Sequence, residues 1–245
     1  MGHGILLSAE NVDFMIHGIC KYSFFGHEVW ITTSHVCILI VLLILIGFAI
    51  AANRCIAKAS EVPAGFQNVV ELIVEKLDGL VAGSMGKGIP KFYYNYIGTI
   101  FIFILFSNIS GLLGLRPPTA DYGVTLPLGL LTFTMIWCNK IKFNKPKDLW
   151  SGMCSPLPPW LPIWFPINVI SEIAVPISLS LRLFANILSG TVMMALIYGL
   201  LGWIATAWPA ALHVYFDLFS GAIQTYVFCM LTMTYISDAR GGAEA

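Results

Sequence analysis

Five long apolar runs dominate the 245-residue sequence and restrict its fold more than any other feature. A helix needs about 20 apolar residues to cross a bilayer, where the lipid offers its backbone no hydrogen-bond partner. The runs cover residues 34–53, 94–115, 122–139, 167–205 and 209–236. Charged residues make up only 11% of the chain, too few to cover a soluble domain of this length. We therefore predict an all-α membrane protein, with about five transmembrane helices in a single membrane domain over residues 1–245.

Lysine and arginine are distributed unequally between the two sides of the predicted membrane. If the N-terminus lies outside, only Lys21 and Arg116 fall on the outer side. Ten others fall on the cytoplasmic side: Arg54, Lys58, Lys76, Lys87, Lys91, Lys140, Lys142, Lys145, Lys147 and Arg240. Because cytoplasmic loops carry the excess of basic residues, we predict an N-out, C-in topology with residues 1–33 as an external segment.

The segment between the first two runs, residues 62–82, has the pattern of an amphipathic helix. Its apolar residues recur at helical spacing: Phe66, Val69, Val70, Ile73, Leu77 and Leu80. Its polar residues lie opposite: Gln67, Glu71, Glu75 and Asp78. We predict a helix that lies on the cytoplasmic face of the membrane and does not cross it.

The fourth run is too long for an upright span. At 1.5 Å per residue it gives about 57 Å of helix, against a hydrocarbon core of about 30 Å. It must tilt strongly, kink at Pro176, or lie partly along the interface. We predict a tilted span that forms an antiparallel hairpin with the fifth. If the turn lies within residues 202–209, residues whose numbers sum to about 408–411 lie at one depth. This places Thr191 level with Asp217–Ser220 and Arg182 level with about Tyr226–Cys229, within a turn of Gln224. Arg182 is then about 10–14 Å from Asp217 along the axis.

Three ionisable residues lie within the last two runs: Glu172, Arg182 and Asp217. A charge in mid-membrane is costly, and such residues usually face a bundle interior or an aqueous cavity. Arg182 is too deep to reach an interface by snorkelling, since apolar residues extend well past it in both directions. Glu172 is near the cytoplasmic start of its helix, so both a functional role and simple solvation remain open for it.

A polar stripe follows one face of the last run. His213, Asp217, Ser220 and Gln224 are spaced i, i+4, i+7 and i+11, and on the fourth run Asn186 lies four residues after Arg182. Such a stripe, ending near the level of a fixed cation, is typical of half of an ion path. The alternative is hydrogen bonding between helices, which explains Ser, Asn and Gln better than it explains an aspartate.

Two sequence stretches resemble subunit a of the F-type ATP synthase: PISLSLRLFANILSG (residues 176–190) and QTYVFCMLTMTYIS (residues 224–237). The resemblance implies that Arg182 is the essential arginine of that family, with Asn186 beside it and Gln224 facing it. It also implies two offset half-channels, one along His213, Asp217 and Ser220, the other past Ser178 and Glu172. The sequence departs from the best-known bacterial pattern, which has an acid at the position of Thr191 and a histidine at that of Asp217.

The resemblance further implies the partners and the location of the chain. The partners would be an oligomeric c-ring, whose carboxylate faces Arg182, the peripheral-stalk b subunits, and the whole F1Fo complex. The chain would be a non-catalytic subunit of the bacterial cell inner membrane that conducts H⁺ or Na⁺. No cofactor or metal is expected, since the six cysteines lack ligand spacing, and a net charge of zero argues against nucleic acid.

Two other classes of membrane protein are alternatives. A secondary cation/proton antiporter also uses membrane acids, but it would ordinarily need more spans and internal repeats. An intramembrane protease would need paired aspartates or a Ser–His arrangement inside the membrane, and the runs contain neither.

Overall fold

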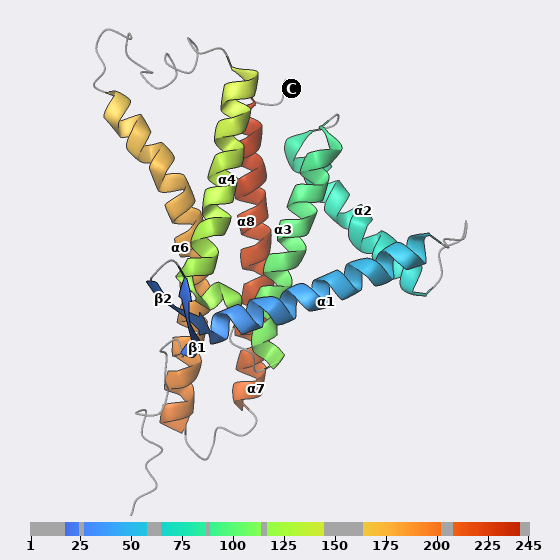
Figure 1. The fold of residues 1–245 in the computed structure, drawn as a ribbon. Helices are drawn as coiled ribbons and strands as arrows, with labels where there is room; N and C mark the ends of the chain where they lie inside the picture. The colour runs from blue at the N-terminus through green and yellow to red at the C-terminus, as the bar shows by residue number, and fades with distance from the viewer. Residues whose placement is uncertain are drawn as a thin grey trace, which may run out of the picture.

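A computed structural model describes residues 18–24, 27–57, 65–86, 89–113, 117–144, 164–201 and 208–240 (Figure 1). The strands are β1 (Gly18–Phe24) and β2 (His27–Thr32). The helical elements are α1 (Thr33–Ile56), α2 (Phe66–Met85), α3 (Lys91–Ile109), η2 (Ser110–Leu113), η3 (Pro118–Ala120), α4 (Tyr122–Phe143), α6 (Trp164–Leu201), α7 (Trp208–His213), η5 (Val214–Ser220) and α8 (Gly221–Ala239). Of these, η2 and η3 are 3-10 turns and η5 is a π-helix.

Five helical stretches are long and apolar enough to cross a membrane, which confirms the predicted number of spans. They are Thr33–Ile56, Lys91–Leu112, Tyr122–Phe143, Phe165–Ile197 and Ala211–Ala239. In no span is more than 33% of the apolar 18-residue stretch buried inside the protein. Most of the apolar surface therefore faces outward, as it does in a protein whose solvent is lipid.

The N-terminal segment contains structure that the all-helical prediction did not include. Strands β1 and β2 pair antiparallel, with Lys21 opposite Trp30 and Phe24 opposite His27. The segment is rich in β-branched and aromatic residues, which favour strands, and it is too short to span a bilayer. At the end of β2, the Thr32 hydroxyl lies 2.6 Å from Nδ1 of His35 in a capping box that begins α1.

Helices α1 and α2 lie to one side of the remaining helices. In Figure 1, α1 runs at a steep angle to α3, α4 and α8, and α2 returns from its far end toward α3. Only Ser34, Cys37 and Val41 of α1 are buried, all near its start. The expected helix at 62–82 is α2, but its buried set includes Gln67, which was expected on the polar face and donates to Oε1 of Glu71 at 2.7 Å.

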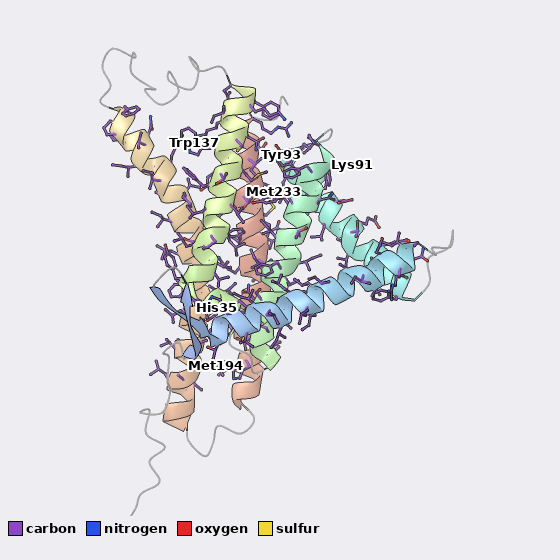
Figure 2. All side chains as sticks on the ribbon, viewed as in Figure 1. His35, Lys91, Tyr93, Trp137, Met194 and Met233 are labelled. Carbon is purple, nitrogen blue, oxygen red and sulfur yellow. The ribbon has the colours of Figure 1, made fainter. Side chains whose placement is uncertain are left out.

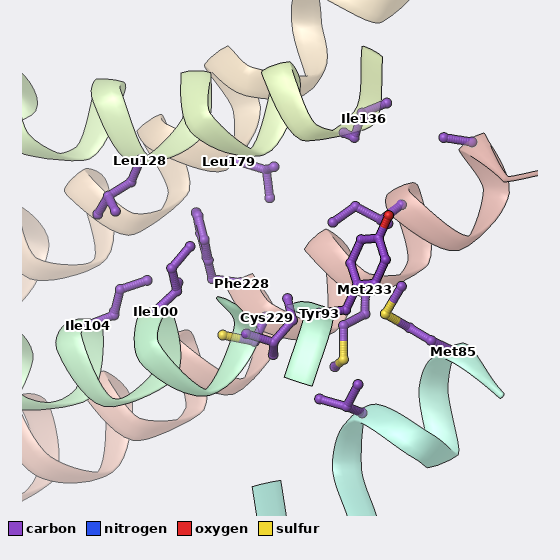
Figure 3. Close-up of a cluster of buried hydrophobic side chains, with 14 of the residues drawn as sticks. Met85, Tyr93, Ile100, Ile104, Leu128, Ile136, Leu179, Phe228, Cys229 and Met233 are labelled. Carbon is purple, nitrogen blue, oxygen red and sulfur yellow. The ribbon is translucent and has the colours of Figure 1, made fainter. Parts of the chain in front are cut away.

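The core lies between α3, α4, α6 and α8, with α2 against one end (Figure 3). Its fully buried side chains include Ile97 and Ile104 of α3, Leu183 of α6 and Phe228 of α8. Figure 2 shows Lys91, Tyr93 and Trp137 at one end of this bundle and His35 and Met194 at the other. The bundle gives α6 and α8 a packed support on their inner sides.

Helix α6 is a continuous helix of 38 residues that contains Pro176. Its upper and lower parts run in different directions in Figure 1. Near the proline, α4 and α6 approach closely, since a Cβ added at Gly129 would lie 2.6 Å from the Pro176 carbonyl oxygen. A side chain at residue 129 would push the two helices apart, so glycine is required for this crossing.

The fifth span consists of three helical pieces in sequence. Helix α7 leads into the π-helix η5, and η5 leads into α8 without a break. A π-helical turn has i→i+5 hydrogen bonds, so it accommodates more residues per turn than an α-helix and turns the flanking side chains relative to one another. This feature was not predicted, and it includes Asp217 and Ser220 of the polar stripe.

Candidate functional site

Arg182 lies near the middle of α6 with its side chain exposed. In the described part of the chain, Lys140 forms an ion pair with Glu172, and Nδ1 of His213 lies within hydrogen-bond distance of Asp217. Arg182 takes part in neither contact. The side chains of Ile177 and Leu181 on the same helix are also exposed. A guanidinium therefore stands on an apolar surface and has no acidic partner among the described residues.

Two of the polar residues predicted for the site are in direct contact between α6 and η5. The Ser220 hydroxyl donates a hydrogen bond of 3.0 Å to Oδ1 of Asn186. The Nδ2 atom of Asn186 is buried, and within the described residues it has no partner. The amide thus offers two unused N–H donors one helical turn from Arg182.

The same contact corrects the predicted register of the last two spans. Residue numbers 186 and 220 sum to 406, and so do 190 and 216, where a Cβ added at Gly190 would lie 3.6 Å from Cβ of Phe216. The expected sum of 408–411 assumed a turn within residues 202–209, and the contacts give a sum lower by two to five. With the observed register, Arg182 is level with Gln224, and Thr191 is level with Tyr215, not with Asp217.

Gln224 is a buried amide with an unpaired nitrogen. Its side chain is only 9% exposed, and its Nε2 atom has no hydrogen-bond partner among the described residues. A buried amide without a partner costs free energy on the order of 1–3 kcal/mol. The register places this unpaired amide nitrogen at the level of Arg182.

His213 and Asp217 form the other end of the stripe. Nδ1 of His213 lies 3.0 Å from Oδ2 of Asp217. The carboxyl group of Asp217 also packs against η2, where a Cβ added at Gly111 would be 3.2 Å from Cγ. Asp217 therefore contacts Gly111, while the Thr191 hydroxyl donates to the Leu188 carbonyl of its own helix at 2.8 Å.

A second group of polar residues surrounds a cavity between α4, α6 and α8. The cavity has a volume of about 300 Å³, and its polar lining includes Lys140, Glu172, Tyr235 and Asp238. Lys140 pairs with Oε1 of Glu172, while Oε2 of Glu172 is buried and without a partner in the described chain. Ser178, the other residue predicted on this side, lies on α6 with its side chain exposed.

Four residues of these sites were not predicted from the sequence: Lys140, Tyr235 and Asp238 at the cavity, and Gly111 beside Asp217. Lys140 was counted only among the basic residues that set topology, and Gly111 was not considered at all. Neither has a local signal, because Lys140 is 32 residues from Glu172 and Gly111 is brought to Asp217 by tertiary packing. A lysine that could pair with the acid at the start of the next span was the one available clue.

Comparisons with known proteins identify the family. The family model described as ATP synthase A chain matches residues 35–237. The chain is 37% identical over 214 residues to "ATP synthase subunit a, sodium ion specific" of Propionigenium modestum, covering 80% of this chain and 71% of that protein. It is 31% identical over 243 residues to "ATP synthase subunit a" of Anoxybacillus flavithermus, covering 91% and 97%. For "ATP synthase subunit a" of Helicobacter pylori the identity is 31% over 229 residues, covering 93% and 97%. The chain, with its exposed arginine level with a buried glutamine, therefore belongs to the ATP synthase A chain family.

Proposed function

We propose that Arg182 separates two half-channels for ions that meet the surface of α6 and α8. As a member of the family, the chain is the ion-translocating subunit of the Fo sector of the ATP synthase. The observation that carries the assignment of Arg182 is its exposed guanidinium without a described partner, level with the unpaired amide of Gln224. A lasting mid-membrane charge needs a partner, and the partner we propose is the carboxylate of a c-ring subunit passing this surface.

The outer half-channel in this proposal follows the polar stripe of the last span. His213 and Asp217 form its entrance, and Ser220, bonded to Asn186, continues it toward Gln224. Asp217 can hold or release the ion, since a carboxylate binds both H⁺ and Na⁺. In this proposal Thr191, which directly follows Gly190 at the contact with Phe216, belongs to the same half-channel.

The inner half-channel is the cavity of about 300 Å³ lined by Glu172, Lys140 and Asp238. Its ionisable groups stand at the end of the bundle where α4 and α8 finish and α6 begins (Figure 1). In this proposal the ion leaves the c-ring past Ser178 and reaches Glu172, whose buried Oε2 has no partner among the described residues.

Arginine suits the position between the two paths. An arginine side chain attracts an ionised carboxylate but does not serve as a proton carrier in proteins. Its fixed positive charge also opposes direct leakage of cations from one half-channel to the other. In this proposal the chain itself is non-catalytic and is coupled to ATP only through the complex.

The orientation in the proposal follows from the basic residues. Lys91, Lys140 and Lys142 lie at one end of the bundle, and the Arg240 guanidinium lies there as well, 5.4 Å from the ring centre of Tyr93. An excess of lysine and arginine marks the cytoplasmic side, which makes the opposite end, near α7, the outer one. The chain is then a single membrane domain of the bacterial inner membrane.

The partners expected for this subunit separate it from an antiporter, an alternative that the comparisons do not support. The test is mild solubilisation of the native membrane followed by purification through a tag on this chain. We expect a c-ring oligomer and b subunits to co-purify with it. The reconstituted complex should pump ions when ATP is added. Recovery of the chain without a c-ring or b subunits, under conditions that keep membrane complexes intact, would overturn the proposal.

A further inference from the structure

The junction between η5 and α8 is held from the side by a buried polar network. Nδ2 of Asn108 donates to the Gly221 carbonyl at 3.0 Å and to Oγ1 of Thr225 at 3.2 Å. Its Oδ1 accepts a bond of 2.8 Å from the Thr119 hydroxyl. Asn108, Thr119 and Thr225 are all 0% exposed. Both N–H groups and the oxygen of the Asn108 amide are therefore used.

The network acts on the residue at which the π-helix ends. Gly221 is the first residue of α8 and directly follows η5. A Cβ added there would lie 2.9 Å from Cβ of Asn108, so α3 packs tightly against the fifth span at this glycine. The Thr225 hydroxyl donates to the same Gly221 carbonyl at 2.8 Å, which closes the network on one peptide group.

We propose that Asn108 is a positioning residue that fixes where the π-helix ends and thereby the rotational setting of Asp217 and Ser220. A π-helical turn contains an extra residue, and its loss would rotate the preceding side chains by about 100° about the helix axis. Asp217 would then leave Gly111, and Ser220 would leave Asn186. Asn108 touches neither Asp217 nor Ser220 through a hydrogen bond of its own; it acts through Gly221 and Thr225.

A specific rival explanation is that Asn108 only holds α3, η3 and α8 together. Asparagine side chains commonly bond between membrane helices for that purpose. A purely structural role would lower the amount of assembled complex without changing the rotation of η5 in the complexes that do assemble. The two roles are therefore separated by a measurement of η5 itself, made on assembled complexes.

Gly190 and Phe216 provide such a measurement. A Cβ added at Gly190 would lie about 3.6 Å from Cβ of Phe216, and this separation is suitable for a disulfide. In a cysteine-free background of the whole ATP synthase, the pair Gly190→Cys and Phe216→Cys should form a disulfide in high yield. The pair Gly190→Cys and Leu218→Cys gives the baseline, because Phe216 supplies the nearest atoms to Gly190.

Adding Asn108→Leu to the reporting pair should lower the disulfide yield per assembled complex by about fivefold, toward the baseline pair, since a 100° rotation exceeds disulfide geometry. Asn139→Leu is the matched control. Asn139 is also a buried amide, bonded to Tyr93 and to the Met135 carbonyl, but it lies far along the bundle from η5. Its replacement should leave the disulfide yield unchanged.

The milder variant Thr119→Val covers the case in which Asn108→Leu does not assemble. It removes only the hydroxyl that bonds to Oδ1 of Asn108, and the disulfide yield should fall to an intermediate value. A wild-type yield in assembled Asn108→Leu complexes, or in Thr119→Val if only that variant assembles, overturns the proposal. The importance of the setting for transport rests on the proposed function, but the disulfide yield does not depend on transport, so failure of either proposal is seen separately.

Discussion

The Ser220 hydroxyl donates to Oδ1 of Asn186 at 3.0 Å, joining the last membrane span to the helix that bears Arg182. Asn186 is one turn beyond Arg182, so the bond fixes the height of the polar stripe relative to the arginine. The register places Gln224 level with Arg182. The polar stripe that begins at His213 ends at this level. The exposed guanidinium of Arg182 and the end of the polar stripe therefore lie at one level.

The first prediction concerns the charge at Arg182. Arg182→Ala should reduce ATP-driven ion pumping and ATP synthesis by on the order of 100-fold or more, the loss expected when a preorganised charge is removed. The complex should still assemble, because the side chain is exposed and makes no ion pair within the described residues. Pumping and synthesis are measured on reconstituted complexes.

Arg182→Lys is the matched control for this variant. Lysine keeps a positive charge but lacks the planar fork and can lose its proton when desolvated, so rescue should be incomplete. Coupled synthesis at the wild-type rate in Arg182→Ala would remove the arginine from the mechanism.

The second prediction compares the two side chains of the contact between His213 and Asp217. Asp217→Asn should slow coupled transport by on the order of 100-fold, as expected for a positioned acid or base. His213→Ala should cost less, because the His213 side chain is 38% exposed against 18% for Asp217, and water can replace it. Transport is measured in vesicles as the rate per assembled complex. Wild-type transport by Asp217→Asn would make the residue structural.

The third prediction uses the contact between Gly111 and Asp217. In Gly111→Ala the new Cβ would lie 3.2 Å from Cγ of Asp217, which is tight enough to displace the carboxyl group from His213. Transport should fall severalfold while assembly is kept, by about tenfold at most if water still reaches the displaced group. Gly98→Ala in the same membrane span is the control, since its Cβ would make an ordinary contact of 3.9 Å with Leu77. Equal transport in both variants would show that the contact is slack.

The number of spans could be predicted because lipid leaves the chain so few choices. A backbone in hydrocarbon must satisfy its hydrogen bonds internally, so each apolar run of sufficient length becomes a helix. This rule identified all five spans and the unusual length of α6. It could not identify the hairpin of β1 and β2, which depends on local strand preference outside the apolar runs.

The details of the site were harder to predict, because they depend on one local irregularity. The sequence Val214–Ser220 has no feature that marks a π-helix. The register was wrong by two to five residues, because it rested on an assumed turn position and not on side-chain contacts such as Ser220 with Asn186. Asp217 was placed level with Thr191, whereas its carboxyl group packs against Gly111. Contacts between residues a hundred positions apart in sequence leave no periodic pattern to recognise.

The fourth prediction concerns the orientation of the bundle. Lys142 and Gly123 are both exposed and lie at opposite ends of α4. In a cysteine-free background, Lys142→Cys should react with a membrane-impermeant thiol reagent only from the cytoplasmic side. Gly123→Cys should react only from the outside. Reversed labelling would exchange the proposed entrance and exit of the ion path.

The fifth prediction separates two roles of the ion pair between Lys140 and Glu172. If Glu172 only balances a charge, Lys140→Met and Glu172→Gln should each weaken assembly. The exchanged pair, Lys140→Glu with Glu172→Lys, should then restore both assembly and transport. If Glu172 also receives the ion in the cavity, as we propose, the exchanged pair should restore assembly alone, because the carboxylate has moved to α4. Transport should then remain lower by on the order of 100-fold, the loss expected for a misplaced acid or base.

The amount of assembled complex and the transport rate per complex are measured for all four proteins. Full transport by the exchanged pair would limit Glu172 to charge balance and move the proposed exit elsewhere on α6.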